Sequence, residues 1–335
     1  MRKIITVAAM ALGLASGFAP MAQAQDVVKF GSTRVPAPVN VAMAKGFFEE
    51  EGLVVEQQFF KSGAEVAPAV ASRMVDVAIT TSGAALFNAF VKGMDVKLVA
   101  DGLTLKPEDP ENDPTAIMVR KELIDTGAVK SGADLAGQRV AITAPGQIID
   151  MIAREYLRQN GVNAEDVTFV SMPPPDMVAA MKGGSIDAAI MLDPFSSIAA
   201  KQGFADKLAA GSDFMPGLQQ AFVLFGPSIT EGNPELGERF LRAYAKGSDW
   251  MREALKTPEG RAEVAAIYQA VIPAQDPKMY ETIAMPTPVE DLRVNVDGDF
   301  GIQWQVDQLA AQGLLLGDPD ISSAVDNSFL DAIAE

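Results

Sequence analysis

Val75-Asp76-Val77-Ala78-Ile79 and Ile186-Asp187-Ala188-Ala189-Ile190 are two versions of one short sequence, each an aspartate followed by apolar residues. An apolar run behind a turn residue is typical of a buried strand. Two earlier strand-like runs precede each version in the same order, at 27–32 and 54–60 in the first and at 139–143 and 167–172 in the second. Because the spacing between copies drifts by only a few residues, the chain is predicted to contain one α/β unit twice.

Two α/β lobes in one chain leave a cleft between them, and in open parallel sheets ligands bind at the carboxyl ends of the strands. The chain has 335 residues, 48% of them hydrophobic, which is enough for two cores. We predict a discontinuous first lobe of residues 26–114 and 226–335 and a second lobe of residues 115–225. The two crossings between the lobes would act as a hinge.

Residues 1–24 have the pattern of a cleaved secretory signal peptide. Arg2 and Lys3 precede an apolar run, and Ala22-Gln23-Ala24 provides a small-residue cleavage site. We therefore expect a mature chain that starts near Gln25 and is exported to the periplasm.

The chain contains no cysteine and no histidine. These absences exclude disulfides, cysteine nucleophiles, imidazole acid–base catalysis and His-ligated zinc. The formal net charge is −17, and removal of Arg2 and Lys3 makes the mature chain more negative still. This charge argues against nucleic acid and anionic membrane surfaces as partners. We expect no catalytic residues, no metal and no cofactor.

Two segments lie outside the repeat. Residues 106–114 contain three prolines and four acidic residues and are predicted to form a solvated loop, since they lack the regular ligand spacing of a calcium-binding loop. After the strand Ala221–Phe225 the sequence becomes helical. Asn233 and Pro234 start one helix, a second follows Pro258, and a third spans about 300–312. This tail is expected to pack on the first lobe.

Several ordered motifs resemble one family. Ala42 to Leu53 matches the pattern A-x-x-K-G-x-F-x-x-x-G-L, and Asp134 to Ala141 is similar to D-L-x-G-K-x-V-A. Gly184 to Ala188, followed by Asp193-Pro194-Phe195, resembles G-x-I-D-A and then an acidic residue, Pro and an aromatic residue. These motifs resemble the nitrate, sulfonate and taurine class of ABC-transporter substrate-binding proteins, also described as pyrimidine-precursor-binding-like. One departure is Leu192, where the family often has an aromatic residue.

The resemblance covers nearly the whole mature chain. It implies a type II periplasmic binding-protein fold, a monomer without catalytic activity, and delivery of a small solute to an inner-membrane ABC permease with its ATPase. Presentation of the solute to a membrane sensor is an alternative. An enzyme on the same fold is a weaker one, because the pyrimidine-forming proteins that resemble this family rely on His and Cys.

In the first lobe, polar residues follow the predicted strands, where free backbone N–H groups favour anions. Arg34 is the one cation among them and could hold a carboxylate or sulfonate through two hydrogen bonds, or pair with a surface acid instead. Ser62 could equally form a capping box with Glu65. The candidate ligand-binding residues are Ser32, Thr33, Arg34, Ser62, Gly63, Thr80, Thr81 and Ser82.

In the second lobe, the loop after residues 139–143 corresponds to the loop at Ser32, and Gln147 offers both a donor and an acceptor. Asp193 is either a helix N-cap before Pro194 or a cleft residue that accepts from an amino group or locks the lobes together. The candidates here are Thr143, Gly146, Gln147, Leu192, Asp193 and Phe195. The hydroxyls and Arg34 favour an anionic solute such as a sulfonate, carboxylate or oxyanion, whereas Asp193 and the apolar residues would suit an aminopyrimidine or aromatic acid.

Overall fold

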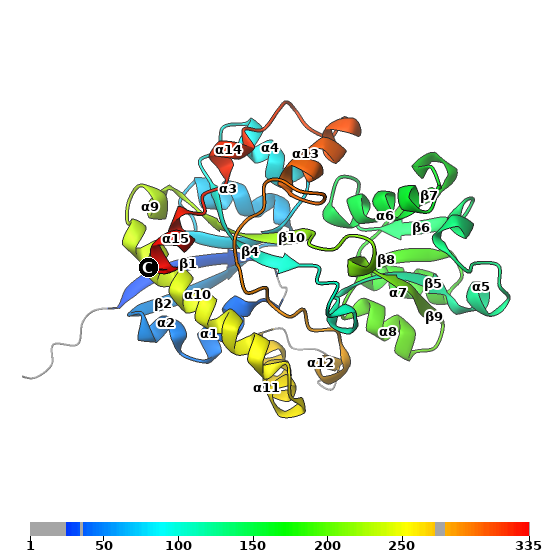
Figure 1. Cartoon of the computed structure of the whole chain (residues 1–335), viewed down its shortest axis with the longest axis horizontal. Helices are drawn as coiled ribbons and strands as arrows, with labels where there is room; N and C mark the ends of the chain where they lie inside the picture. Colours follow the sequence, from blue (N-terminus) through cyan, green and yellow to red (C-terminus); the bar gives the residue numbers. More distant parts are fainter. Residues whose placement is uncertain (1–24, 34–35, 272–278, 335) are drawn as a thin grey trace, which may run out of the picture.

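The computed structural model of this chain describes residues 25–33, 36–271 and 279–334 (Figure 1). The predicted signal peptide and Arg34 lie outside the described residues. Two α/β lobes are arranged side by side along the long axis of the molecule, as the repeat predicts.

The first lobe is built on a mixed five-stranded sheet in the order β2-β1-β3-β10-β4. Its strands are β1 (Asp26–Ser32), β2 (Leu53–Phe59), β3 (Val77–Thr81), β4 (Lys97–Thr104) and β10 (Gln219–Phe225). β1, β2 and β3 pair in parallel, and β10 runs antiparallel to both β3 and β4. The carboxyl ends of β1, β3 and β4 therefore meet at one edge of the sheet.

The second lobe repeats this arrangement in the order β7-β6-β8-β5-β9. Its strands are β5 (Thr115–Arg120), β6 (Arg139–Ile142), β7 (Thr168–Ser171), β8 (Ala188–Leu192) and β9 (Ala205–Ala210). The antiparallel strand β5 occupies the place that β10 occupies in the first sheet. The two sheets thus share one topology, which confirms the internal repeat.

The repeated aspartates have a structural role in both lobes, as predicted. Asp76 precedes β3, and its Oδ2 accepts a hydrogen bond from the backbone N–H of Lys29 at 2.9 Å. Asp187 precedes β8, and its Oδ2 accepts from the backbone N–H of Arg139 at 3.0 Å. Each carboxylate fastens the start of one strand to its parallel neighbour.

Helices cover both faces of each sheet (Figure 1). The helices of the first lobe before the crossing are α1 (Pro38–Ala44), α2 (Phe47–Glu50), α3 (Val66–Ala71) and α4 (Ala84–Val91). Those of the second lobe are α5 (Lys121–Asp125), α6 (Ile148–Gln159), α7 (Pro174–Lys182) and α8 (Phe195–Lys201). After β10 come α9 (Pro227–Thr230), α10 (Pro234–Ala254), α11 (Pro258–Val271), α12 (Met279–Thr282), α13 (Ile302–Ala311), α14 (Ile321–Ala324) and α15 (Ser328–Ala334).

Apolar packing fixes the long helix α10 against the first sheet. Asn233 caps this helix by accepting from the backbone N–H of Leu236 at 3.2 Å, as its sequence position predicts. Phe240 on α10 packs against Phe30 and Phe225 of the sheet and against Phe48 of α2, with ring centroids 4.9–6.1 Å apart. This cluster holds one wall of the first lobe rigid.

Two adjacent chain crossings connect the lobes, residues 105–114 and 211–218. Leu105 donates its backbone N–H to Leu218 O at 3.0 Å, and Gly217 donates to Leu105 O at 2.9 Å. The buried Asp113 accepts from the backbone N–H of Ser212 at 2.6 Å. Because β10 follows the return crossing and pairs in the first sheet, the lobe boundary expected after residue 225 lies ahead of β10 instead.

The C-terminal segment was predicted to pack on the first lobe. It contacts both lobes, so the prediction was incomplete. α10 and α15 pack on the first lobe, as expected, whereas α13 lies between α4 and α6 (Figure 1). The carboxylate of Asp193 in the second lobe accepts from the backbone N–H of Ala284, just after α12.

No helix among the described residues has the length and apolar character needed to cross a membrane.

Candidate functional site

A cavity of about 100 Å³ lies at the carboxyl edge of the first sheet, where it faces the second lobe. A space of this size holds several water molecules or part of a small organic solute. The walls come from strand ends, α1, α10, α11 and the segment after α12, with Leu192 added from the second lobe. The lining residues are Thr33, Pro36, Ala37, Pro38, Ile79, Thr80, Thr81, Asp101, Gly102, Leu103, Thr104, Leu192, Gln220, Ala221, Tyr244, Tyr268, Pro286, Thr287, Pro288 and Leu292.

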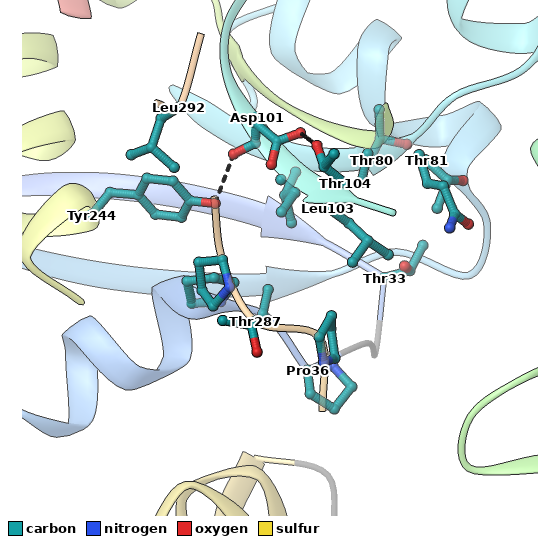
Figure 2. Close-up of a pocket in the computed structure, with 18 of the residues that line it drawn as sticks. Thr33, Pro36, Thr80, Thr81, Asp101, Leu103, Thr104, Tyr244, Thr287 and Leu292 are labelled. Atoms are coloured by element: carbon teal, nitrogen blue, oxygen red, sulfur yellow. Dashed lines mark hydrogen bonds between the residues drawn. The ribbon is translucent and has the colours of Figure 1, made fainter. Parts of the chain in front are cut away.

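The sheet topology brings the polar part of this lining together. Thr33 follows β1, Thr80 and Thr81 end β3, and Thr104 ends β4. Figure 2 shows these threonines around one space. Parallel strands whose carboxyl ends share an edge produce such a ring of hydroxyls without any sequence proximity.

Asp101 is the only charged residue among the described residues that line the cavity, and it is 3% exposed. Its Oδ1 accepts from Thr104 Oγ1 at 2.7 Å and from Gln219 Nε2 at 3.0 Å. The hydroxyl of Tyr244 donates to the backbone carbonyl of Asp101 at 2.9 Å (Figure 2). Burial raises the pKa of Asp101 to about 7, against the lowering effect of these side-chain hydrogen bonds.

An irregularity in β4 places Asp101 and Leu103 on the cavity wall. Asp101 pairs with Phe222 and Leu103 with Ala221, so Gly102 is an extra residue in the ladder. Bulges of this kind redirect side chains at sheet edges. A methyl group on Gly102 would lie 2.8 Å from Ile79 Cδ1 and 3.1 Å from the backbone of Ala221, which explains the glycine.

Four of the predicted site residues line the cavity: Thr33, Thr80, Thr81 and Leu192. A fifth, Gly63, lies directly behind it, because a methyl group at Gly63 would approach Thr80 Oγ1 to 2.9 Å. Ser32 is buried outside the lining, and its hydroxyl accepts from Gln57 Nε2 at 3.3 Å. Arg34 lies outside the described residues, so its role stays a prediction.

Two other first-lobe candidates have different partners. Ser62 is exposed, and its hydroxyl makes no cap bond to the helical turn that follows, so the capping box was a wrong prediction. The Glu65 carboxylate accepts instead from the backbone N–H of Lys61 at 3.3 Å. Ser82 is buried, and its hydroxyl is bonded to the amide oxygen of Gln305 on α13.

Three second-lobe candidates surround a contact between the lobes, away from the cavity lining. The backbone N–H of Ala84 donates to Gly146 O at 2.8 Å, and Gly83 forms an isolated β-bridge with Gln147. The Gln147 side chain is exposed. Thr143 has a buried hydroxyl without a hydrogen-bond partner among the described residues. Gly146 and Gln147 therefore join the lobes through the backbone.

Asp193 both caps α8 and links the lobes. Its carboxylate accepts from the backbone N–H of Ser197 at 2.9 Å and from the hydroxyls of Ser196 and Ser197. It also accepts from the backbone N–H of Ala284. Phe195 packs in the apolar cluster of the second lobe. In this conformation, neither side chain lines the cavity.

Sequence reasoning missed more than half of the polar lining. Asp101, Thr104, Gln220 and Thr287 were not among the candidates, and neither were the wall residues Tyr244 and Tyr268. Asp101 could have been recognised from the sequence, because a charged residue within the apolar strand Lys97–Thr104 indicates a specific structural or functional role. The two tyrosines could not have been recognised, because aromatic residues on amphipathic helices usually belong to the hydrophobic core.

No cluster of three or more acidic side chains placed to hold a metal ion occurs in residues 25–33, 36–271 and 279–334.

Comparison with known proteins identifies the family. The model of the family described as NMT1/THI5 like matches residues 35–259. The chain belongs to the NMT1/THI5-like family. The nitrate/nitrite binding protein NrtA of Nostoc sp. is 24% identical over 291 residues, which are 80% of this chain and 61% of that protein, so the chain spans less than two thirds of this relative. A putative aliphatic sulfonates-binding protein of Bacillus subtilis is 23% identical over 90% of this chain and 86% of its own length.

A solved structure shares the fold of this NMT1/THI5-like chain. The periplasmic aliphatic sulphonate binding protein SsuA from Escherichia coli superposes with a TM-score of 0.73 at 19% identity, over 90% of this chain and 92% of that chain. The two mixed sheets therefore form the type II periplasmic binding-protein fold, as predicted from the motifs. The resemblance to nitrate- and sulfonate-binding proteins is confirmed as well.

Proposed function

We propose that this chain is an extracytoplasmic solute-binding protein. It captures a small organic, anionic solute such as a sulfonate or carboxylate by closure of its lobes and delivers it to an ABC permease with its ATPase in the inner membrane. The observation that carries this proposal is the cavity at the carboxyl edge of the first sheet, closed by Leu192 from the other lobe. Membership in the NMT1/THI5-like family and the names of its relatives support it.

The hydroxyls of Thr33, Thr80 and Thr81 are the anion-binding groups in this proposal. They can donate to several oxygens at once, and Gly63 leaves room behind Thr80. Arg34, next to Thr33 in the sequence, would supply the charge. Periplasmic location, a monomeric state and the absence of catalysis belong to the same proposal. The lack of His and Cys in the sequence supports the last of these.

A thermal-shift screen of the purified mature chain against sulfonates, carboxylates, inorganic oxyanions and aminopyrimidines tests the proposal. A solute present at 100 times its Kd adds about 2.7 kcal/mol to the free energy of unfolding. Binding by at least one anion class, measured by calorimetry, is the expected result. Failure of all classes to bind would refute the proposed function.

Matched variants locate the bound solute. Thr80→Val and Thr81→Val remove hydroxyls from the cavity while keeping the side-chain volume, and we expect each to weaken binding about tenfold, as for a lost hydrogen bond to a charged group. Thr168→Val is the control, because Thr168 is an exposed strand residue of the second lobe. Equal effects of the three substitutions would place the solute elsewhere.

A further inference from the structure

We propose that Asp101 recognises the solute directly and that the solute carries a protonated amino group. This inference rests on the proposed function and refines its substrate class. The carboxylate would receive N–H donors from the ammonium group, while the threonine hydroxyls of the same cavity hold the anionic end. The solute class is then a small amino acid or aminosulfonate with separated charges.

Asp101 lines the cavity together with Thr104 and Tyr244, and Figure 2 shows the three side chains around one space. The donors that the structure gives its carboxylate are the Thr104 hydroxyl, the Gln219 amide and the backbone N–H of Leu103. An ionised carboxylate has about four acceptor sites, so three protein donors leave capacity for a donor from the cavity.

Asp101 has no counter-ion among the described residues of the cavity lining, which include no lysine or arginine. The titratable residues that α10 and α11 contribute to the cavity lining are Tyr244 and Tyr268, both neutral. Arg293, near the covering residue Leu292, pairs with Asp331 instead. Burial of a carboxylate without a counter-ion is costly, and a cationic solute would reduce that cost.

The walls beside Asp101 are largely aromatic and aliphatic. Tyr244 and Tyr268 line the cavity together with Leu103 and Leu292. Aromatic rings beside a carboxylate suit the polarised methylenes and the charge of an alkylammonium group. The ionised carboxylate of Asp101 would repel an anionic group placed at this end of the cavity.

A structural role alone is the competing explanation. Gln219 bonds to Asp101 and also contacts the covering segment, donating to Arg293 O at 2.8 Å and accepting from the backbone N–H of Asn295 at 2.7 Å. Asparagine at position 101 keeps an acceptor for Thr104 and Gln219 but removes the negative charge. A structural role is therefore largely preserved in Asp101→Asn, whereas recognition of an ammonium group is lost.

The test uses two matched pairs of probes, 4-aminobutyrate with butyrate and 3-aminopropane-1-sulfonate with propane-1-sulfonate. Calorimetry at pH 8 should show that, in at least one pair, the wild type binds the amino compound about thirty-fold more tightly than the matched compound without nitrogen. This ratio corresponds to the lower limit of the free energy lost when one partner of a buried charge pair is removed. Asp101→Asn should abolish this preference. Asp187→Asn, which alters a buried aspartate of the second lobe outside the cavity, should retain it.

A second measurement follows the pH dependence of solute binding. Because the ammonium group binds the ionised carboxylate, binding below pH 7 requires Asp101 to release a proton, and the affinity should fall about tenfold per pH unit there. Above pH 7 the affinity should level off. Calorimetry in buffers of different ionisation enthalpy should record this proton release at pH 6, and Asp101→Asn should show none.

The outcomes separate the two proposals. Equal binding of both members of each pair, a screen hit without an amine, or an unchanged preference in Asp101→Asn would overturn the assignment of Asp101 and leave the proposed function standing. Absence of binding by all four probes, together with an empty wider screen, would overturn both.

Discussion

Asp76 and Asp187 occupy the same place in the two lobes but have different partners, which makes them a built-in comparison. Each accepts from a backbone N–H of the neighbouring strand. Asp187 in addition binds Arg139 through Nε and Nη2, both at 2.8 Å, and Arg120 through Nη2 at 3.2 Å. We predict that replacing each aspartate by alanine will destabilise the protein unequally.

The size of the difference follows from these contacts. Asp187→Ala leaves two guanidinium groups without their carboxylate, and breaking a buried pair costs about 3–5 kcal/mol. Because the Arg139 side chain is 41% exposed, water recovers part of that cost, and we expect a loss of about 3 kcal/mol in the free energy of unfolding. Asp76→Ala removes one hydrogen bond at a partly exposed position, for which about 1 kcal/mol is expected.

Urea unfolding followed by circular dichroism at pH 7 measures both losses by linear extrapolation. A larger loss for Asp187→Ala, by about 2 kcal/mol, is the expected result under the ranges above. Hydrogen bonds from Arg139 lower the pKa of Asp187, so its stabilising effect is present above the ordinary aspartate pKa of about 3.9 and disappears as the pH falls through the lower folded pKa. The gap between wild type and Asp187→Ala should therefore narrow below about pH 4. Equal losses for both variants at pH 7 would refute the reasoning.

Three further predictions concern the whole molecule. Gly146→Ala should raise the Kd for the solute about tenfold relative to Gly161→Ala, since overpacking by a methyl group costs about 1–3 kcal/mol. Gly161→Ala is the matched control, because both glycines have φ of +73°. Of the two, only Gly146 would bring the added methyl group against the other lobe, 3.2 Å from Ala84 Cβ. Comparable affinities in titration calorimetry would show that this lobe contact does not take part in binding. Small-angle scattering should show a smaller radius of gyration at saturating solute than without it, unless the lobes are already closed when empty, which a spectroscopic distance between labelled lobes checks. Mass spectrometry of osmotic-shock fluid should find a chain that starts near Gln25, and recovery of the intact N-terminus would contradict the predicted cleavage.

The sequence by itself determined the repeated unit, the succession of strands along the chain in each copy, and the family. These features are encoded locally, because apolar runs, turn glycines and capping residues act on neighbouring positions. Asp76 and Asp187 were predictable as turn residues for the same reason. Thr80 and Thr81 were predictable as cavity residues because the carboxyl ends of parallel strands meet at one edge.

Only the tertiary structure decided which polar residues face the cavity. Ser82 directly follows Thr81, yet its hydroxyl is taken by Gln305, more than two hundred residues later. Asp101 reaches the cavity through a bulge whose position depends on pairing with β10, a strand that returns after the whole second lobe. Gly146 and Asp193 became lobe contacts for the same reason. Each of these outcomes depends on partners distant in the chain, and local sequence patterns carry no record of such partners.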